Sequence, residues 1–414
     1  HMSDSLYTVF EGLNQYNLRY FFAHIDLFRN ESGDNPVNIN WIEMNNTRLN
    51  LLQLAAKNGY YSLVELLLPI NQININLRSG VQGYSALLYA SSSGFVDIVE
   101  LLLEKGADIN LLSFNNETAL HVASSHGHFE VVKFLIEHYG NLLNKIDTNG
   151  NTALHLAVQN GRFKIAEFLL SIPGIEVNTV NKKHESPLML AVSENRMRIV
   201  TLLCQNPNVD INLADNENSP LHMAVIRNAL PVVKEMIVLG NNRLEINAKD
   251  RYGQTPLLRA LKLKFMDIAL FLLDQPTIDV NVKNNDNRTV LSYASEMGYF
   301  DIVKRILLNK TDTKSSPIEF NINDTDFFGQ TALHLAAKNG HFDIMKLLLD
   351  AGIDQDIQNS VLHFIFLIHR MFYYIISNKI STIYFSNQTA FQCIPEKHLE
   401  KARNCFDNLD KLMK

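Results

Sequence analysis

The sequence predicts an all-α repeat solenoid, and three observations lead to this fold class. The six-residue pattern TALHLA at 152–157 returns almost unchanged at 118–123, 219–224 and 331–336. Weaker copies make nine in register, at intervals of 33 to 42 residues, and they begin at Asn50, Ser85, Ser186, Thr255 and Thr289. Each copy opens two successive runs in which apolar residues recur with helical spacing. Fixed self-similarity of this length is typical of stacked repeats.

The residues of a single repeat show why each copy should form two helices and a turn. The hydroxyl of Thr152 can cap a helix start, and proline follows this position in other copies, at Pro187, Pro220 and Pro256. Leu154 and Ala157 fall on one helical face, and Gly161 ends the short helix. A second amphipathic run, 163–170, precedes an extended piece and a turn such as 147–150. A unit of helix, turn, helix and hairpin finger cannot bury its apolar face alone, so the units must stack.

The hexapeptide and its period resemble the ankyrin-repeat family, whose signature is T-P-L-H-x-A. The resemblance implies stacked ankyrin helix-turn-helix units with β-hairpin fingers. It also implies that the signature histidines are structural and tie neighbouring loops together by hydrogen bonds; these are His121, His155, His222 and His334. Because successive repeats rise by roughly 10 Å, we expect no metal shared among these side chains.

The pattern weakens at both ends. We predict a degenerate first repeat that acts as a cap at 3–44, nine repeats at 45–358, and degenerate repeats or capping helices at 359–414. An insertion at 309–320 is read as a surface loop, either tolerated or part of a binding face. The apolar stretch 364–376 is too short and too often interrupted for a membrane span, which needs about 20 apolar residues.

Composition restricts the classes of function. The 414 residues are 46% hydrophobic and 19% charged, with a net charge of −6 and no cluster of Lys and Arg. We therefore expect no nucleic-acid partner, because phosphate binding needs such a cluster. The odd number of cysteines (Cys204, Cys393 and Cys405) predicts a reducing, cytoplasmic setting.

No catalytic or cofactor motif stands out. The sequence has no phosphate-binding glycine loop, and the spacing of its cysteines matches no metal site. We predict a protein that is not an enzyme and needs no cofactor or metal. The alternative is a cryptic activity in the C-terminal region, where Cys393 and His398 lie close in sequence and His369 lies upstream.

The family resemblance implies a binding function. In ankyrin proteins, finger tips and exposed positions of the first helices line a concave groove. Here we expect a monomer that binds another protein in this groove. The finger-tip candidates are Phe114, Asn115, Asn149, Lys183, Arg251, Tyr252, Phe327 and Phe328. The first-helix candidates are Tyr89, His126, Arg259 and Tyr293. Aromatic and Arg side chains are the usual anchors of an interface.

Other interpretations remain open. The repeats could be a rigid scaffold or adaptor that docks partners at its ends. The composition and the charged tail at 410–414 resemble ankyrin effectors that intracellular bacteria deliver into the host cytosol through a type IV secretion system. Hairpin asparagines such as Asn110 and Asn178 could be hydroxylated or purely structural. Fingers with His184 or Glu217 in place of the turn glycine are expected to be reshaped, for a ligand or by drift.

Overall fold

Side-chain capping starts every first helix of the repeats. The Thr152 hydroxyl accepts a hydrogen bond from the His155 backbone N–H, and the imidazole of His155 accepts one in return from the Thr152 N–H. Thr118 and Thr331 form the same reciprocal box with His121 and His334. These caps satisfy amide groups that a helix start otherwise leaves without partners. The predicted capping role of the signature Thr is therefore confirmed.

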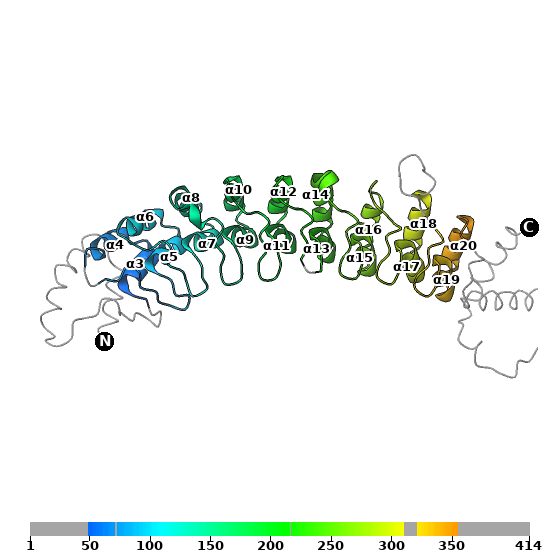
Figure 1. Ribbon diagram of the computed structural model, residues 1–414, viewed down its shortest axis with the longest axis horizontal. Coiled ribbons are helices and arrows are strands. Elements are labelled where there is room, and N and C mark those ends of the chain that lie inside the picture. Colours follow the sequence, from blue (N-terminus) through cyan, green and yellow to red (C-terminus); the bar gives the residue numbers. More distant parts are fainter. Residues whose placement is uncertain (1–48, 71–72, 216, 310–320, 355–414) are drawn as a thin grey trace, which may run out of the picture. The chain divides into compact units, whose positions relative to one another are not determined.

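The computed structural model describes residues 49–70, 73–215, 217–309 and 321–354 (Figure 1). Within these residues the chain divides into two units at Asp215. The predicted cap at 3–44, the insertion and the stretch 359–414 lie outside the described residues, apart from the insertion's first position, and their boundaries stay predictions. No helix among the described residues is long and apolar enough to cross a membrane.

Among its described residues, the first unit holds five helix pairs that stack in two rows. Its first-helix row consists of α3 (Leu51–Asn58), α5 (Ala86–Ser93), α7 (Ala119–His126), α9 (Ala153–Gln159) and α11 (Pro187–Ser193). Its second-helix row consists of α4 (Tyr61–Leu67), α6 (Val96–Glu104), α8 (Phe129–His138), α10 (Phe163–Ser171) and α12 (Met197–Gln205). A short 3₁₀ turn, η2 (Gly140–Leu142), follows α8.

The second unit repeats this plan with four helix pairs in the part that the structure describes. Its first-helix row consists of α13 (Pro220–Ile226), α15 (Pro256–Lys262), α17 (Val290–Met297) and α19 (Ala332–Lys338). Its second-helix row consists of α14 (Leu230–Gly240), α16 (Met266–Leu273), α18 (Phe300–Asn309) and α20 (Phe342–Asp350), with η3 (Asn241–Arg243) after α14. In Figure 1 the fingers hang from the first-helix row, on the side away from the second helices.

Small residues hold the first-helix row close together. The alanine at the sixth position of the repeat is fully buried in all nine pairs, with 0% exposure at Ala157 and its equivalents. A larger side chain there would meet the neighbouring helix, because protein interiors are close-packed. The second helices contribute Leu, Ile and Val to the same core, as Ile165 and Leu169 do on α10.

A ladder of side chains links successive turns between the two helices of a pair. His128 donates from Nε2 to the Ser92 carbonyl at 2.7 Å, Arg162 to Ser125 at 3.0 Å, and Arg196 to Gln159 at 3.1 Å. In the second unit, His341 donates to the Glu296 carbonyl at 3.0 Å. Each donor comes directly after the left-handed residue at the end of a first helix. The sequence analysis did not predict that these side chains join neighbouring repeats.

Alanine substitutions at two matched glycines test how much this ladder contributes to the free energy of unfolding. Gly94 and Gly106 both have left-handed φ values, 86° and 92°. A Cβ at Gly94 would lie 2.3 Å from His128 Nδ1, whereas one at Gly106 would meet nothing within 4 Å. We expect Gly106→Ala to cost about 1 kcal/mol in backbone strain. Gly94→Ala should cost about 0.5–1.5 kcal/mol more, because His128 loses its bond to Ser92. Urea titration of both variants measures the difference, and equal costs would contradict the ladder.

The hairpin asparagines join the repeats along a second line. Asn178 accepts the Asp210 N–H on Oδ1 and donates from Nδ2 to the Asn208 carbonyl, both at 2.9 Å. Asn247 makes the equivalent pair of bonds with Asp279 and Thr277. Because both ends of each amide are used, these two asparagines have a structural role.

Candidate functional site

The fingers are compact turns rather than regular β-strands. Among the described residues the only bridge outside the helices joins Ser79 to Tyr84. Six other fingers are five-residue turns closed by a backbone bond, such as that from Asp147 N–H to the Asn151 carbonyl at 2.9 Å; they lie at 113–117, 147–151, 181–185, 250–254, 284–288 and 326–330. The expected hairpin fingers are therefore tight turns without regular strands among the described residues.

A polar residue at the base fixes the shape of each of these five-residue turns. Asp147 accepts the N–H groups of Asn149 and Asn151 on one oxygen, at 2.7 and 2.8 Å. Asp250 and Asp326 do the same in the second unit, and Asn181 replaces them in the finger of Lys183. These bonds satisfy backbone amides inside the turn, so the finger is ordered before any partner arrives.

The fourth residue of each five-residue turn is left-handed. Glycine occupies this position in the finger of Gly150, but Asn116, His184 and Asn287 adopt the same conformation, with φ of 57°, 61° and 62°. The turn of His184 is closed by the same bond, from Asn181 N–H to the Glu185 carbonyl at 3.0 Å. The expectation that this finger is reshaped is therefore wrong, because the Asn181 side chain holds the turn.

Backbone hydrogen bonds connect each finger tip to the next. In the first unit, Thr148 donates to the Asn115 carbonyl and Lys182 to the Asn149 carbonyl, both at 2.8 Å. In the second unit, the Asn285 N–H donates to the Tyr252 carbonyl at 3.1 Å. The Phe327 N–H donates to the Asp286 carbonyl at 3.3 Å. Asn115, Asn149, Tyr252 and Phe327 therefore lie in continuous rows within their own units.

The predicted finger-tip residues are exposed. In the first unit this holds for Phe114, Asn115, Asn149 and Lys183, and the Arg78 guanidinium lies 5.5 Å from the centre of the Phe114 ring. In the second unit the exposed fractions are 44% for Tyr252, 72% for Phe327 and 78% for Phe328. Arg251 stacks on the Tyr252 ring and pairs with Glu217. The tips thus present large apolar surfaces on an ordered backbone.

The first-helix candidates differ in their exposure. His126 is exposed, while Arg259 and Tyr293 are half-buried, and Arg259 approaches the Asp250 carboxylate to 3.5 Å. Tyr89 is only 6% exposed and packs edge-on against Tyr84, with ring centres 5.4 Å apart. The expectation of Tyr89 as an exposed contact residue is wrong, because the long first finger (79–84) folds over its ring.

Three of the four signature histidines connect their repeat to the next finger, whereas Nε2 of His334 has no hydrogen-bond partner among the described residues. His121 Nε2 donates to the Asn151 carbonyl at 2.9 Å, and His155 and His222 donate to Glu185 and Gln254 in the same way. Their other ring nitrogen bonds the capping hydroxyl at 2.8 Å. Burial lowers the pKa of His121 and brings that of His155 to about 4. Neutral, hydrogen-bonded rings of this kind serve the structure.

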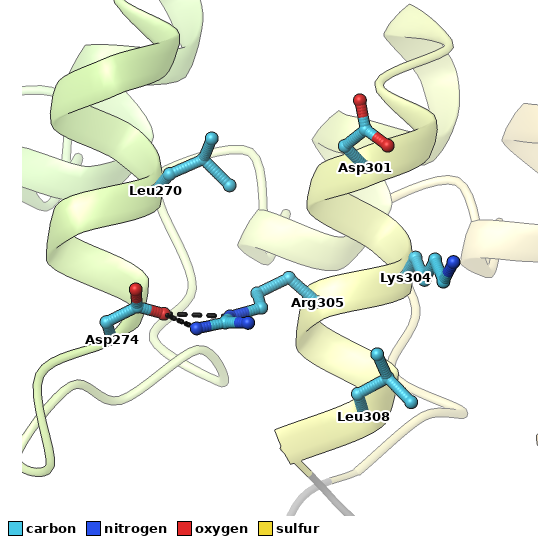
Figure 2. A pocket seen from close by; sticks show the side chains of 6 residues that line it. All are labelled: Leu270, Asp274, Asp301, Lys304, Arg305 and Leu308. Atoms are coloured by element: carbon cyan, nitrogen blue, oxygen red, sulfur yellow. Dashed lines mark hydrogen bonds and ion pairs between the residues drawn. The ribbon is translucent and has the colours of Figure 1, made fainter.

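The described residues hold no group of three His, Cys, Asp or Glu side chains that could bind a metal. One cavity of about 370 Å³ lies between the second helices α16 and α18 and is lined by Leu270, Asp274, Asp301, Lys304, Arg305 and Leu308. Figure 2 shows Arg305 reaching across to Asp274, with Nε and Nη2 at 2.8 and 2.6 Å from one carboxylate oxygen. The pair is half exposed, and its contribution to stability is under about 1 kcal/mol. None of the predicted contact residues lines this cavity.

Comparisons with known proteins identify the repeats. The family model described as ankyrin repeats (3 copies) matches overlapping segments at 25–113, 111–181, 172–250, 188–284, 221–317 and 278–359. The ankyrin repeat domain of Bcl-3 aligns with 51% of this chain and 90% of its own, at 22% identity and a TM-score of 0.45.

Two curated relatives are plant proteins. A probable E3 ubiquitin-protein ligase of Oryza sativa subsp. japonica is 52% identical over 52 residues, which are 13% of this chain and 10% of the relative. An E3 ubiquitin-protein ligase of Arabidopsis thaliana is 37% identical over 82 residues, 20% of this chain and 16% of the relative. The aligned segments thus span at most 16% of either relative's length.

The matched segments of the family model run from residue 25 to residue 359 and cover most of the chain. They contain every helix pair described above, with its cap, its finger and its buried alanine. Ankyrin repeats generally mediate protein–protein interaction. The chain belongs to the ankyrin-repeat family.

Proposed function

We propose that this chain binds a partner protein through its finger face. The finger face is the surface formed by the finger tips and by the exposed positions of the first-helix row; the sequence predicts it as a groove. The observation that carries the proposal is the exposure of Phe327, at 72%, on a turn whose backbone is fixed by Asp326 and Asp286. An exposed aromatic ring on an ordered backbone loses little entropy on binding, and such residues dominate interface energies.

Polar contacts place the finger bases and the first helices on one face. Arg288, at the end of a finger, bonds Glu296 on α17 at 2.6 Å, and its Nε lies 3.4 Å from Asp326 in the next finger. Arg259 on α15 likewise approaches Asp250 of its own finger. A partner that covers the tips of the second unit would therefore also meet its first-helix row.

Photo-cross-linking tests which face binds. We expect a benzoylphenylalanine at position 327 to join the chain covalently to a partner in cell extract. The same group at Val238 on α14, which is 72% exposed in the second-helix row, should give no such product. The comparison is matched because both positions are equally exposed. Cross-linking from position 238 alone, or equally from both, would contradict the proposal.

The finer interpretations stay predictions. Ankyrin repeat proteins are typically binding modules without enzymatic activity, although the plant relatives are named as ligases. The cryptic Cys393 and His398 activity, the docking at the chain ends and the secretion tail at 410–414 concern residues outside the described ranges.

A further inference from the structure

The first-helix row of the second unit carries a strip of cations. Arg227 follows α13, Lys262 ends α15, Lys264 lies two residues further, and Lys338 ends α19. Arg227, Lys264 and Lys338 are exposed, and Lys262 is half-buried. Within the described part of the chain none of the four has an acidic group within ion-pair distance. The packing order α13, α15, α17, α19 brings these helix ends into one line (Figure 1).

Three of the acidic groups near this strip are already engaged. Glu296 on α17, the acid in line with the cations, is 2.6 Å from Arg288. The buried Asp250 lies beside Arg259, and Asp326 beside Arg288. The four cations of the strip therefore have no ion-pair partner among the described residues, although exposed carboxylates follow them at Asp267 and Asp343.

The fold does not require these cations. Positive side chains are favoured at helix C-termini by the helix dipole, so the strip alone could be a stability device. At the position of Lys262 and Lys338, the helices of the first unit carry one lysine and four uncharged residues: Lys57, Ser92, Ser125, Gln159 and Ser193. The first helices of both units are seven or eight residues long and begin at the same kind of side-chain cap. A cation at this position is therefore not required for the helix to form.

Lys264 also occupies a costly backbone position. Its φ is 63°, the left-handed conformation that glycine adopts after α3, α5, α7 and α17. A lysine there is less stable than glycine by roughly 1 kcal/mol. Asn195 and Asn228, at the equivalent turns, tolerate this conformation better than lysine does. The backbone conformation at position 264 therefore favours glycine or asparagine over the lysine that is present.

Apolar side chains accompany the cations. Leu263 lies between Lys262 and Lys264 and is 39% exposed, and Met297 on α17 is 40% exposed. Lys262 lies 5.8 Å from the centre of the Tyr293 ring. The strip therefore alternates positive charge with apolar surface, which complements a peptide of acidic and apolar residues.

We infer that the second unit selects an acidic segment of its partner, with apolar residues interspersed, along the strip Arg227–Lys262–Lys264–Lys338. This inference rests on the proposed function and adds the chemistry of the partner. A nucleic acid would also bring negative charge. The acids Glu217 and Asp286 at the finger tips disfavour it, because a continuous phosphate backbone cannot avoid them.

Selection from a phage-displayed library of short random peptides tests the inference on the full chain. We expect the enriched peptides to be rich in Asp and Glu relative to the starting library. The reversal variant Arg227→Glu, Lys262→Glu, Lys264→Glu should lose this enrichment. The control Lys164→Glu, Lys304→Glu reverses exposed charges on α10 and α18 and should keep it. No acidic enrichment on the native chain, or the same enrichment on the reversal variant, would overturn the inference.

Two further measurements sharpen this test. A labelled selected peptide should bind Lys264→Gly at least about tenfold more weakly than the native chain, although the variant melts at a higher temperature. Unchanged affinity would show that Lys264 does not contribute to binding of the peptide. A labelled single-stranded DNA that binds more tightly than the peptide, and depends on the same three cations, would assign the strip to nucleic acid. Peptide selection could fail while cross-linking from position 327 succeeds. That result would support the proposed function and contradict the inference of an acidic partner segment.

Discussion

Replacing His155 with alanine is expected to lower the free energy of unfolding by about 3 kcal/mol at neutral pH. The ring is fully buried and donates from Nε2 to the Glu185 carbonyl at 3.2 Å. Its Nδ1 accepts the Thr152 N–H at 3.2 Å. The variant leaves a cavity, a buried carbonyl without its donor and a helix start without half of its cap. Urea unfolding measures the loss.

The same residue makes the stability depend on pH. Burial brings the pKa of His155 to about 4, below its ordinary value of 6.5. Below pH 6.5 the His155 side chain is protonated in the unfolded chain. In the folded chain it stays neutral until the pH falls to about 4. This contribution is fully present above pH 6.5 and is lost as the pH falls towards 4, by about 3 kcal/mol in total. The pKa values of His121 and His334 are lowered in the same direction.

His126→Ala is the matched control for both measurements. His126 is an exposed histidine at the end of α7, and we expect its removal to change the free energy of unfolding by less than about 0.5 kcal/mol. His155→Ala should flatten the loss of stability between pH 6.5 and 4, whereas His126→Ala should keep it. Equal acid sensitivity in the native chain and in His155→Ala would contradict the structural role of the ring.

The repeat frame could be predicted from the sequence because its determinants are local. A Thr three residues before His155, an alanine two residues after it and a glycine at the helix end each act within one or two turns of helix. The roles of His128 and Arg162 could not be found in this way. A basic residue directly after a helix-ending glycine is a weak signal, and its acceptor lies in the preceding repeat, 36 or 37 residues away.

The finger face could be predicted only in part. The tips Phe114 and Phe327 follow from their position in the repeat, but the burial of Tyr89 depends on the length of the finger that covers it. The sequence predicts a reshaped finger at His184, but the Asn181 side-chain oxygen accepts the N–H groups of Lys183 and Glu185 and holds the turn in its usual form. The cation strip joins residues from three repeats that no local pattern relates.

Replacing Tyr252 and Phe327 with alanine is expected to weaken partner binding by about 30-fold or more. Each ring exposes a large apolar area, and truncation of a central aromatic anchor costs about 2 kcal/mol or more. The folded chain should keep its melting temperature, because both side chains lie at finger tips and Asp250 and Asp326 hold the turns without them. The control pair Val238→Ala and Phe300→Ala removes exposed apolar surface from the second-helix row.

The affinity of these two double variants for the partner cross-linked at position 327 tests the finger-face account most directly. Titration calorimetry with the purified partner should show the loss for Tyr252→Ala, Phe327→Ala and native affinity for Val238→Ala, Phe300→Ala. Native affinity of the finger-tip variant, or a loss confined to the control pair, would contradict the account and place the binding surface on the second-helix row.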